Sequence, residues 1–256
     1  MSETNGTVEF RVDDAIGLLT INRPDKLNAL SVEMLTMLEA HVAEIDRRRD
    51  VRVVILAAAG ERAFSVGADV NAWSALEPLD MWRWWVRDGH RVMQRLASLR
   101  QPTIAAVQGL AFGGGLELAM ATDIRVASAD AVFAMPEVRI GTLPGWGGTQ
   151  RLPALVGAAR AKQMVFSGQR IDAVTAERWG LVNEVVPADA LAERATQMAQ
   201  QIAANAPIAV QLAKSAIDHD TTALEAFAGA LAAGAEDGKE GMAAYRDKRA
   251  PQFRGE

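Results

Sequence analysis

Runs of apolar and polar residues divide the first quarter of the chain into short elements. Residues 7–12 and 16–21 are β-rich and are separated by a polar turn signal, which predicts two short strands. Residues 31–45 place apolar side chains on one face at helical spacing, so an amphipathic helix is expected there. The continuous apolar run 51–56 is typical of a strand buried on both faces.

The same alternation continues through the middle of the chain. We expect a helix over about 79–99, a buried strand at 103–107 and two further short strands at 124–127 and 132–134. Strands that alternate with helices predict an α/β domain whose functional loops leave the strand ends.

Beyond about residue 186 the pattern changes to alanine-rich segments with a helical period and no strand signal. Three helices are expected there, at 188–204, 207–218 and 224–248. The sequence therefore predicts two parts, an α/β catalytic core at 1–186 and a helical C-terminal region at 187–256.

Composition narrows the function classes. The chain has 256 residues, is 50% hydrophobic and carries a formal net charge of −5. This charge argues against nucleic-acid binding, which needs a positive contact face. The chain has no cysteine, which excludes disulfides and thiol nucleophiles. The polar N-terminus does not resemble a signal peptide, and no apolar stretch is long enough to span a membrane, so a cytoplasmic enzyme is expected.

Several common catalytic motifs are missing from the sequence. It contains no dinucleotide-binding G-x-G-x-x-G, no P-loop and no G-x-S-x-G nucleophile elbow. The histidines, at positions 41, 90 and 219, fall in predicted helices away from every glycine-rich loop. We therefore expect neither a metal site nor a nucleophilic mechanism, and no separate cofactor.

Three glycine-bearing segments remain as candidates, at 63–69, 109–117 and 135–151. In the second segment, three successive glycines remove every Cβ, so a ligand atom can approach the backbone closely. A helix that begins at Gly114 or Gly115 leaves its first N–H groups unpaired, and its dipole favours negative charge there. This arrangement suits a developing oxyanion, and Glu117 falls within the same first turn.

The other two segments offer matching groups. A helix that starts at Asp69 would leave the N–H of Ala68 available, while Glu137 and Gly145 occupy the third segment. Each feature also has a plainer explanation: Asp69 as a helix N-cap, Glu117 as a first-turn glutamate and Glu137 as a solvent-facing loop residue. The combination is specific, although no single segment is decisive.

Longer motifs carry a family resemblance. The segments FSVGAD, GLAFGGGLELAMATDIRVA and MPEVRIGTLPGWGGTQRL closely resemble the enoyl-CoA hydratase/isomerase (crotonase) superfamily, and RPDKLNAL and YRDKRAPQF match it too. The likeness covers nearly the whole chain. It implies a spiral of stacked ββα units with a helical C-terminal trimerisation region, assembled as a homo-oligomeric trimer or dimer of trimers.

The resemblance also implies an acyl-CoA substrate, with coenzyme A as part of the substrate. By motif position, the N–H groups of Ala68 and Gly114 form the oxyanion hole, Glu117 and Glu137 are the paired catalytic carboxylates, and Gly145 helps to place the catalytic water. The residues expected to contact coenzyme A are Lys26, Leu27, Ala68, Asp69, Tyr245 and Lys248, of which the last two come from a neighbouring subunit. The plainer alternatives are solvated charges for the lysines, a core position for Leu27 and helix packing for Tyr245.

The expected reaction is hydration of a trans-2-enoyl-CoA to a 3-hydroxyacyl-CoA, with Glu117 activating water and Glu137 protonating Cα. Isomerisation or acyl-CoA dehydration on the same scaffold is the nearest alternative, although the isomerase branch usually lacks a glutamate at position 117. A further alternative is a non-catalytic acyl-CoA-binding subunit. Family members that have lost catalysis usually lack one of the two carboxylates.

Two features depart from the family pattern. Trp146 stands where a small residue is usual, and Asn71 stands where many hydratases have lysine. The stretch 71–90 also holds four tryptophans, at 73, 82, 84 and 85. These aromatic side chains either pack in the core or line a remodelled acyl pocket.

Overall fold

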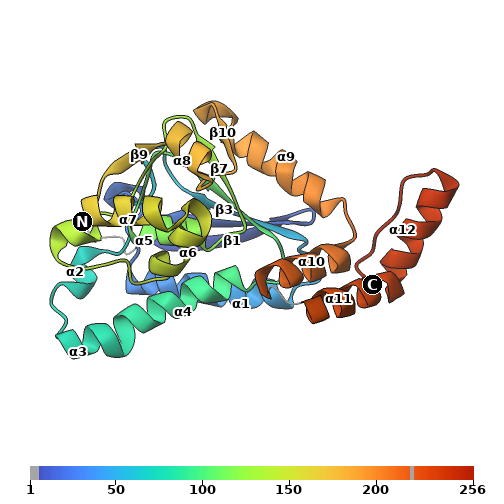
Figure 1. Cartoon of the computed structure of the whole chain (residues 1–256), viewed down its shortest axis with the longest axis horizontal. Helices are drawn as coiled ribbons and strands as arrows, with labels where there is room; N and C mark the ends of the chain where they lie inside the picture. Colours follow the sequence, from blue (N-terminus) through green and yellow to red (C-terminus); the bar gives the residue numbers. More distant parts are fainter. Residues whose placement is uncertain (1–5, 220–221) are drawn as a thin grey trace.

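The computed structural model describes residues 6–219 and 222–256, and within these residues ten strands form two sheets (Figure 1). The larger sheet has the order β1 (Thr7–Asp13), β2 (Ile16–Asn22), β3 (Val53–Ala58), β5 (Thr103–Val107), β7 (Ile124–Ser128) and β10 (Glu184–Val186). The smaller sheet has the order β4 (Ala63–Ser65), β6 (Leu110–Phe112), β8 (Val132–Ala134) and β9 (Arg170–Asp172).

The chain winds between the two sheets as a spiral of ββα units. β3, β5 and β7 lie parallel in the larger sheet, and each is followed by its partner β4, β6 or β8 in the smaller one. Helical segments come after each pair: α2 (Val70–Trp73), α3 (Pro78–Asp80), the π-helix η2 (Met81–Trp85) and α4 (Val86–Ala97); then α5 (Gly114–Met120); then the 3₁₀ helix η3 (Glu137–Ile140) and α6 (Gly148–Val156). The expected α/β spiral is confirmed.

Both faces of the larger sheet are covered by apolar side chains. One face packs on a core that includes α1 (Val32–Arg47), α4 and α5, with fully buried Leu19, Leu56 and Phe64. The other face packs on α9 (Leu191–Ala203) through Ile55, Ile104 and neighbouring residues. This burial on both sides explains why β3 is continuously apolar and why β5 is apolar after Thr103.

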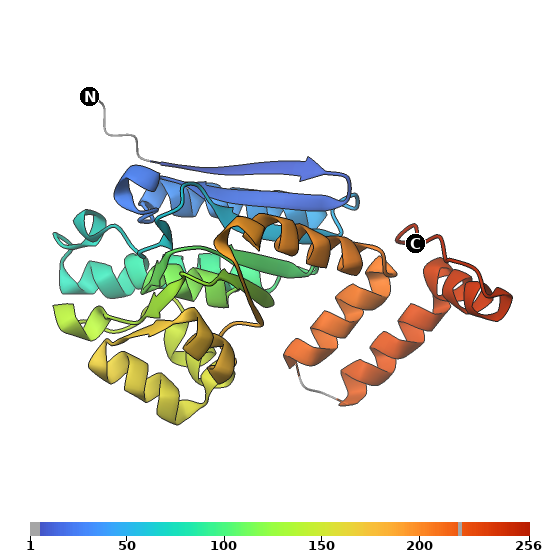
Figure 2. The ribbon, with the colours of Figure 1, turned by 90° about the horizontal axis from the view of Figure 1, so that it is seen from above.

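The remaining helices complete the core and form the C-terminal region. They are η1 (Pro24–Lys26), α7 (Ala158–Ser167), α8 (Ala173–Trp179), η4 (Ala188–Ala190), α10 (Pro207–His219), α11 (Thr222–Gly234) and α12 (Glu236–Asp247). Figures 1 and 2 show α11 and α12 extending beyond the edge of the sheets. α9, in contrast, packs on the larger sheet although it follows the last strand.

The single helix expected at 224–248 is wrong, because the structure has two helices there. The backbone turns at Ala235, which is extended with φ −64 and ψ 155. Gly238 then lies so close to the carbonyl of Ala232 that any Cβ would overlap it. The chain therefore changes direction between α11 and α12, as Figures 1 and 2 show, at a glycine-bearing stretch that the helical period alone did not mark as a break.

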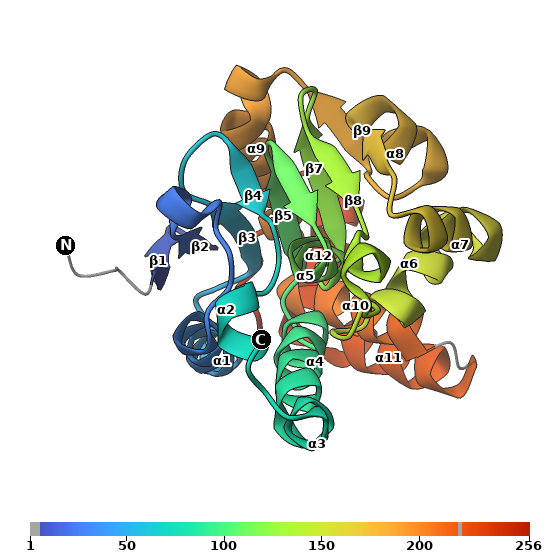
Figure 3. The same cartoon turned by 90° about the vertical axis from the view of Figure 1, so that its left-hand side faces the viewer.

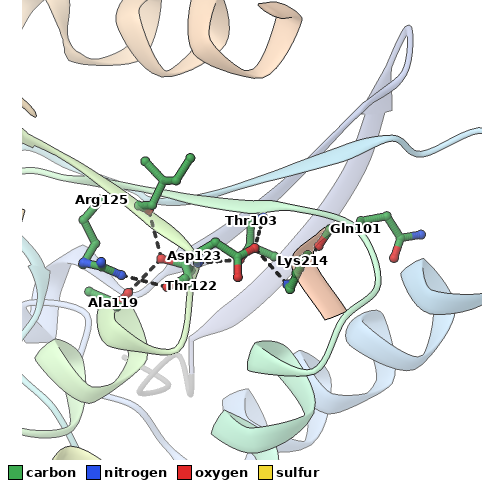
Figure 4. A network of polar contacts seen from close by, with 8 residues as sticks. Gln101, Thr103, Ala119, Thr122, Asp123, Arg125 and Lys214 are labelled. Carbon is green, nitrogen blue, oxygen red and sulfur yellow. Dashed lines mark hydrogen bonds and ion pairs between the residues drawn. The ribbon is translucent and has the colours of Figure 1, made fainter. Parts of the chain in front are cut away.

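A polar network ties α10 to the core (Figure 4). The Nζ of Lys214 donates to Asp123 Oδ2 at 2.8 Å and to the carbonyl of Gln101 at 3.3 Å. Asp123 also accepts from the backbone N–H and the hydroxyl of Thr103, at 2.7 and 2.9 Å. α10 is thus fixed to the start of β5. In the described part of the chain, no helix is long and apolar enough to cross a membrane.

Candidate active site

The loop that leads to Ala68 is held by a buried asparagine. The side chain of Asn28 donates to the carbonyls of Ala59 and Ala63, at 2.9 and 2.8 Å, and accepts from the N–H of Arg23 at 2.8 Å. The hydroxyl of Ser65 donates to the carbonyl of Asn28 at 2.8 Å. These bonds fix β4 and the turn before it against the segment 23–28, because Asn28 bonds to backbone groups in defined positions.

Ala68 lies in a short stretch of extended pairing. The N–H of Leu30 donates to the carbonyl of Gly67 at 2.8 Å, and the N–H of Asp69 donates to the carbonyl of Leu30 at 2.9 Å. The N–H of Ala68, between these two bonds, has no recorded partner in the described residues. Gly67 has a φ of +98, a conformation that glycine adopts without strain.

The amides of Ala68 and Gly114 are neighbours in space. A Cβ built on Gly114 would lie 3.3 Å from the N of Ala68, and one built on Gly67 would lie 2.9 Å from the N of Gly114. A Cβ on Gly115 would overlap the carbonyl of Ser65, so only glycine lets α5 approach β4 this closely. α5 begins at Gly114, so the N–H of this residue belongs to the unpaired first turn of the helix.

These groups line one pocket of about 140 Å³. Figure 3 shows α2 and α4, which both contribute to its wall, on the side that faces the viewer. Ala68, Gly114, Glu117, Glu137 and Gly145 all contribute to its wall. The structure therefore brings together the five residues that the sequence analysis proposed for catalysis.

Glu117 is buried and held by backbone donors. Its Oε1 accepts from the N–H groups of Trp146 and Gly148, each at 2.7 Å. Burial raises the pKa of Glu117, while these two N–H groups and the positive charge of Arg151 act to lower it. Hydrogen bonds from N–H groups stabilise the charged carboxylate, so the surroundings of Glu117 partly offset the cost of burying it.

Glu137 has different surroundings. Both of its carboxyl oxygens are buried and have no hydrogen-bond partner in the described part of the chain. Burial raises the pKa of Glu137 to about 7, and the negative charge of Glu117 adds to the effect while a bond from its own N–H opposes it. Gly113 lies beside the carboxyl group, since a Cβ there would be 3.1 Å from Oε1. Burial thus favours the protonated form of both carboxyl groups, but only Glu117 has backbone N–H donors that stabilise the charged form.

The residues expected to contact coenzyme A fall in two places. Leu27 is half-buried and its carbonyl accepts from the N–H of Val66 at 3.2 Å, while Lys26 is exposed on η1. The carboxylate of Asp69 caps α2 through Asn71 and pairs with Arg23 at 2.7 Å. Burial acts to raise the pKa of Asp69, but these partners outweigh it and the pKa is lowered.

Tyr245 and Lys248 lie far from this pocket within one chain. Both are exposed, Tyr245 on α12 and Lys248 at its C-terminal end. Figures 1 and 2 place α12 at the opposite end of the molecule from α2, which lines the pocket. The structure of a single chain does not bring these two residues to the other candidates.

The tryptophans differ in whether they pack in the core, line the pocket or do neither. Trp73, Trp85 and Trp146 line the pocket, and the last two are also buried in the core. Trp82 is 66% exposed and Trp84 is 37% exposed, and neither lines the pocket. The sequence analysis did not single out Asn28, Ser65 or Arg151, although Asn28 lies within the RPDKLNAL segment.

The fold consists of two sheets wound from ββα units, and one pocket in it brings together two backbone N–H groups and two carboxyl groups. This combination defines a scaffold for acid–base chemistry on a carbonyl compound. The chain belongs to the enoyl-CoA hydratase/isomerase family, whose sequence profile matches residues 11–256.

Comparison with individual relatives supports the assignment to this family. The chain is 43% identical to the short-chain-enoyl-CoA hydratase of Clostridium acetobutylicum, over 91% of this chain and 92% of that protein. It is 37% identical to the (E)-benzylidenesuccinyl-CoA hydratase of Thauera aromatica, over 97% and 99% of the two chains. The crystal structure of an enoyl-CoA hydratase from Bacillus anthracis superposes with a TM-score of 0.93 at 37% identity, covering 99% of this chain and all of that one (100%).

Proposed function

We propose that the protein hydrates a trans-2-enoyl-CoA to a 3-hydroxyacyl-CoA. The observation that carries the proposal is the arrangement of Ala68, Gly114, Glu117 and Glu137 around one pocket. Relatives that bear the name enoyl-CoA hydratase support the same reaction.

Negative charge builds up on the thioester oxygen when water adds to Cβ. The N–H groups of Ala68 and Gly114 are close enough to serve one oxygen, and removing a single donor of this kind typically costs about 3–4 kcal/mol of transition-state stabilisation. Because α5 begins at Gly114, the positive end of its dipole adds to this stabilisation.

The two carboxyl groups take different roles. Glu117, which accepts two backbone N–H groups, is the better anion and acts as the base that takes a proton from water. Glu137, which has no such donors and a pKa of about 7, carries the proton that is delivered to Cα. The segment from Gly145 to Gly148 supplies the donors to Glu117 and so helps to place the water beside it.

Crotonyl-CoA tests the reaction directly, through loss of the enoyl-thioester absorbance. We expect turnover by the unsubstituted protein and a fall of about 10²–10⁴-fold in Glu117→Gln and in Glu137→Gln. Glu61→Gln, at an exposed loop position, is the matched control. Near-normal turnover by both pocket variants would overturn the two-carboxylate mechanism.

A 3-enoyl-CoA substrate separates hydration from isomerisation. A hydratase leaves this compound unchanged, whereas an isomerase converts it to the 2-enoyl form, which product analysis detects. Tight binding of crotonyl-CoA without turnover would instead indicate a non-catalytic binding protein.

A homo-oligomer, a trimer or a dimer of trimers, forms part of the proposal. Large apolar side chains are exposed on α10, α11 and α12: Ile217, Phe227, Leu231, Met242 and Tyr245. Such a surface is typical of an interface between subunits. In the assembly, Tyr245 and Lys248 would reach the nucleotide end of coenzyme A in a neighbouring subunit, beside Lys26 and Leu27 of that subunit. Sedimentation analysis tests the assembly, and a higher KM in Tyr245→Ala tests the contact. The cytoplasmic location expected from the sequence belongs to the proposal too.

A further inference from the structure

The indole of Trp146 fills a slot between two helices. A Cβ on Gly89 of α4 would overlap the pyrrole side of the ring, and a Cβ on Gly114 of α5 would lie 2.8 Å from its benzene side. Trp85 packs against the same indole with a centroid distance of 5.7 Å. The side chain is 3% exposed, so every edge of the ring is enclosed or faces the pocket.

The backbone of Trp146 is fixed as well. Its N–H donates to Glu117 at 2.7 Å, and its carbonyl accepts from Arg151 at 3.1 Å. A large side chain held at both its backbone and its ring cannot move aside without breaking these contacts. Trp146 is therefore a rigid part of the pocket wall.

This wall stands on the acyl side of the reacting carbons. The polar groups of the pocket are the amides of Ala68 and Gly114 and the two carboxyl groups, and the rest of its lining is mainly apolar. Trp146 follows Gly145 directly and hydrogen-bonds Glu117, the residue assigned to Cβ. Carbons beyond Cβ must then lie against the apolar lining, which includes Trp73, Trp85 and Trp146.

The pocket is small, at about 140 Å³. A cavity of roughly 150 Å³ in another protein is known to hold one benzene molecule, which has six carbon atoms. The volume of the pocket is therefore about that occupied by six carbon atoms.

We propose that Trp146, seated against Gly89, closes the acyl end of the pocket and restricts the enzyme to short 2-enoyl groups. Gly89 is the position that makes room for the indole, so the two residues act as a matched pair. The inference rests on the proposed function for the identity of the thioester, but the steric limit itself applies to any acyl-CoA.

Binding and turnover across a series of chain lengths test this pair. Affinities for butyryl-, hexanoyl- and decanoyl-CoA are measured by calorimetry, and hydration rates are measured with the matching 2-enoyl-CoAs. The unsubstituted protein should bind decanoyl-CoA at least about tenfold more weakly than butyryl-CoA. Trp146→Ala should remove most of that difference, while Trp82→Ala, at an exposed tryptophan outside the pocket, should keep it.

Gly89→Ala supplies an independent check. Its added Cβ collides with the indole, so we expect weaker binding of every acyl-CoA, and the double variant Gly89→Ala/Trp146→Ala should recover affinity and prefer the longer chains. Trp146→Leu replaces Trp146→Ala if the latter fails to fold, as judged from its thermal unfolding.

The outcomes separate the inference from the proposed function. Equal affinity of the unsubstituted protein for all chain lengths, or a preference that Trp146→Ala and Trp146→Leu leave unchanged, overturns the inference even if crotonyl-CoA is hydrated. Selective binding of short chains without any hydration overturns the proposed function, while the role of Trp146 stands.

Discussion

Substituting Glu137 by glutamine removes a titratable group from the pocket and nearly keeps its size and shape. Burial raises the pKa of Glu137 from 4.5 to about 7 in the folded protein. Between these values the folded state binds more protons than the unfolded chain, so the stability that this group contributes is complete below pH 4.5 and is lost as the pH rises through about 7. Glu137→Gln has no carboxyl group at this position, so it does not lose this stability as the pH rises.

The magnitude follows from the two pKa values. One pKa unit corresponds to about 1.36 kcal/mol, so the change from 4.5 to about 7 sets an upper limit of about 3 kcal/mol. The carboxyl oxygens are buried but the residue as a whole is only half-buried, so solvent screens part of the effect. We expect the stability of the variant relative to the unsubstituted protein to rise by about 2 kcal/mol between about pH 5 and about pH 8.5.

Urea unfolding at both pH values measures this difference. Equal subunit concentrations are needed, because association changes apparent stability. Titrating groups away from the pocket are common to both proteins and cancel in the comparison, whereas Glu117 interacts with Glu137 and its contribution is part of the measured difference. Glu61→Gln, at an exposed loop position, is the matched control. The variant should also be almost inactive. If the stability difference is the same at both pH values, burial does not hold the carboxyl group of Glu137 in its neutral form, and its role as proton donor loses its physical basis.

Two further substitutions test how the site and the C-terminal helices are held. Asn28→Ala removes three hydrogen bonds to backbone groups, two of them buried, and we expect a loss of about 3 kcal/mol in unfolding free energy, measured in urea. A loss below about 0.5 kcal/mol would show that the loop does not depend on this amide. Lys214→Met removes the ion pair with Asp123, and we expect a loss of about 1–3 kcal/mol together with faster release of α10–α12 in limited proteolysis. Unchanged proteolysis would mean that other contacts fix these helices.

Element type could be predicted where the sequence carries a long or regular pattern. α1 has five buried apolar residues on one face over sixteen positions, and β5 is buried throughout its length and apolar after Thr103, so both were expected correctly. The strands β4, β6, β9 and β10 were missed. Each has only three residues, which is too short for a period to show, although β8, of the same length, was predicted at 132–134. The strand geometry of the four missed strands comes from pairing with other segments.

The residues of the candidate site could be predicted from the sequence, but the surroundings that set their chemistry could not. The glycines at 113–115 indicated a helix start whose backbone a ligand atom can approach closely, and α5 does begin at Gly114. The sequence does not reveal that Glu137 is buried without a partner or that Gly89 makes room for Trp146, because these relations join residues far apart in the chain. Such contacts appear only once the spiral has brought the helices together.

One short segment sets both the acid–base chemistry and the size of the pocket. The N–H groups of Trp146 and Gly148 hold Glu117 and favour its charged form, while the indole of Trp146 closes the acyl side. The first effect comes from the backbone and the second from the side chain. Substitution of the indole should therefore change which acyl chain is accepted without removing the donors to Glu117. A proline at position 146, in contrast, would remove one donor and would disturb the base directly.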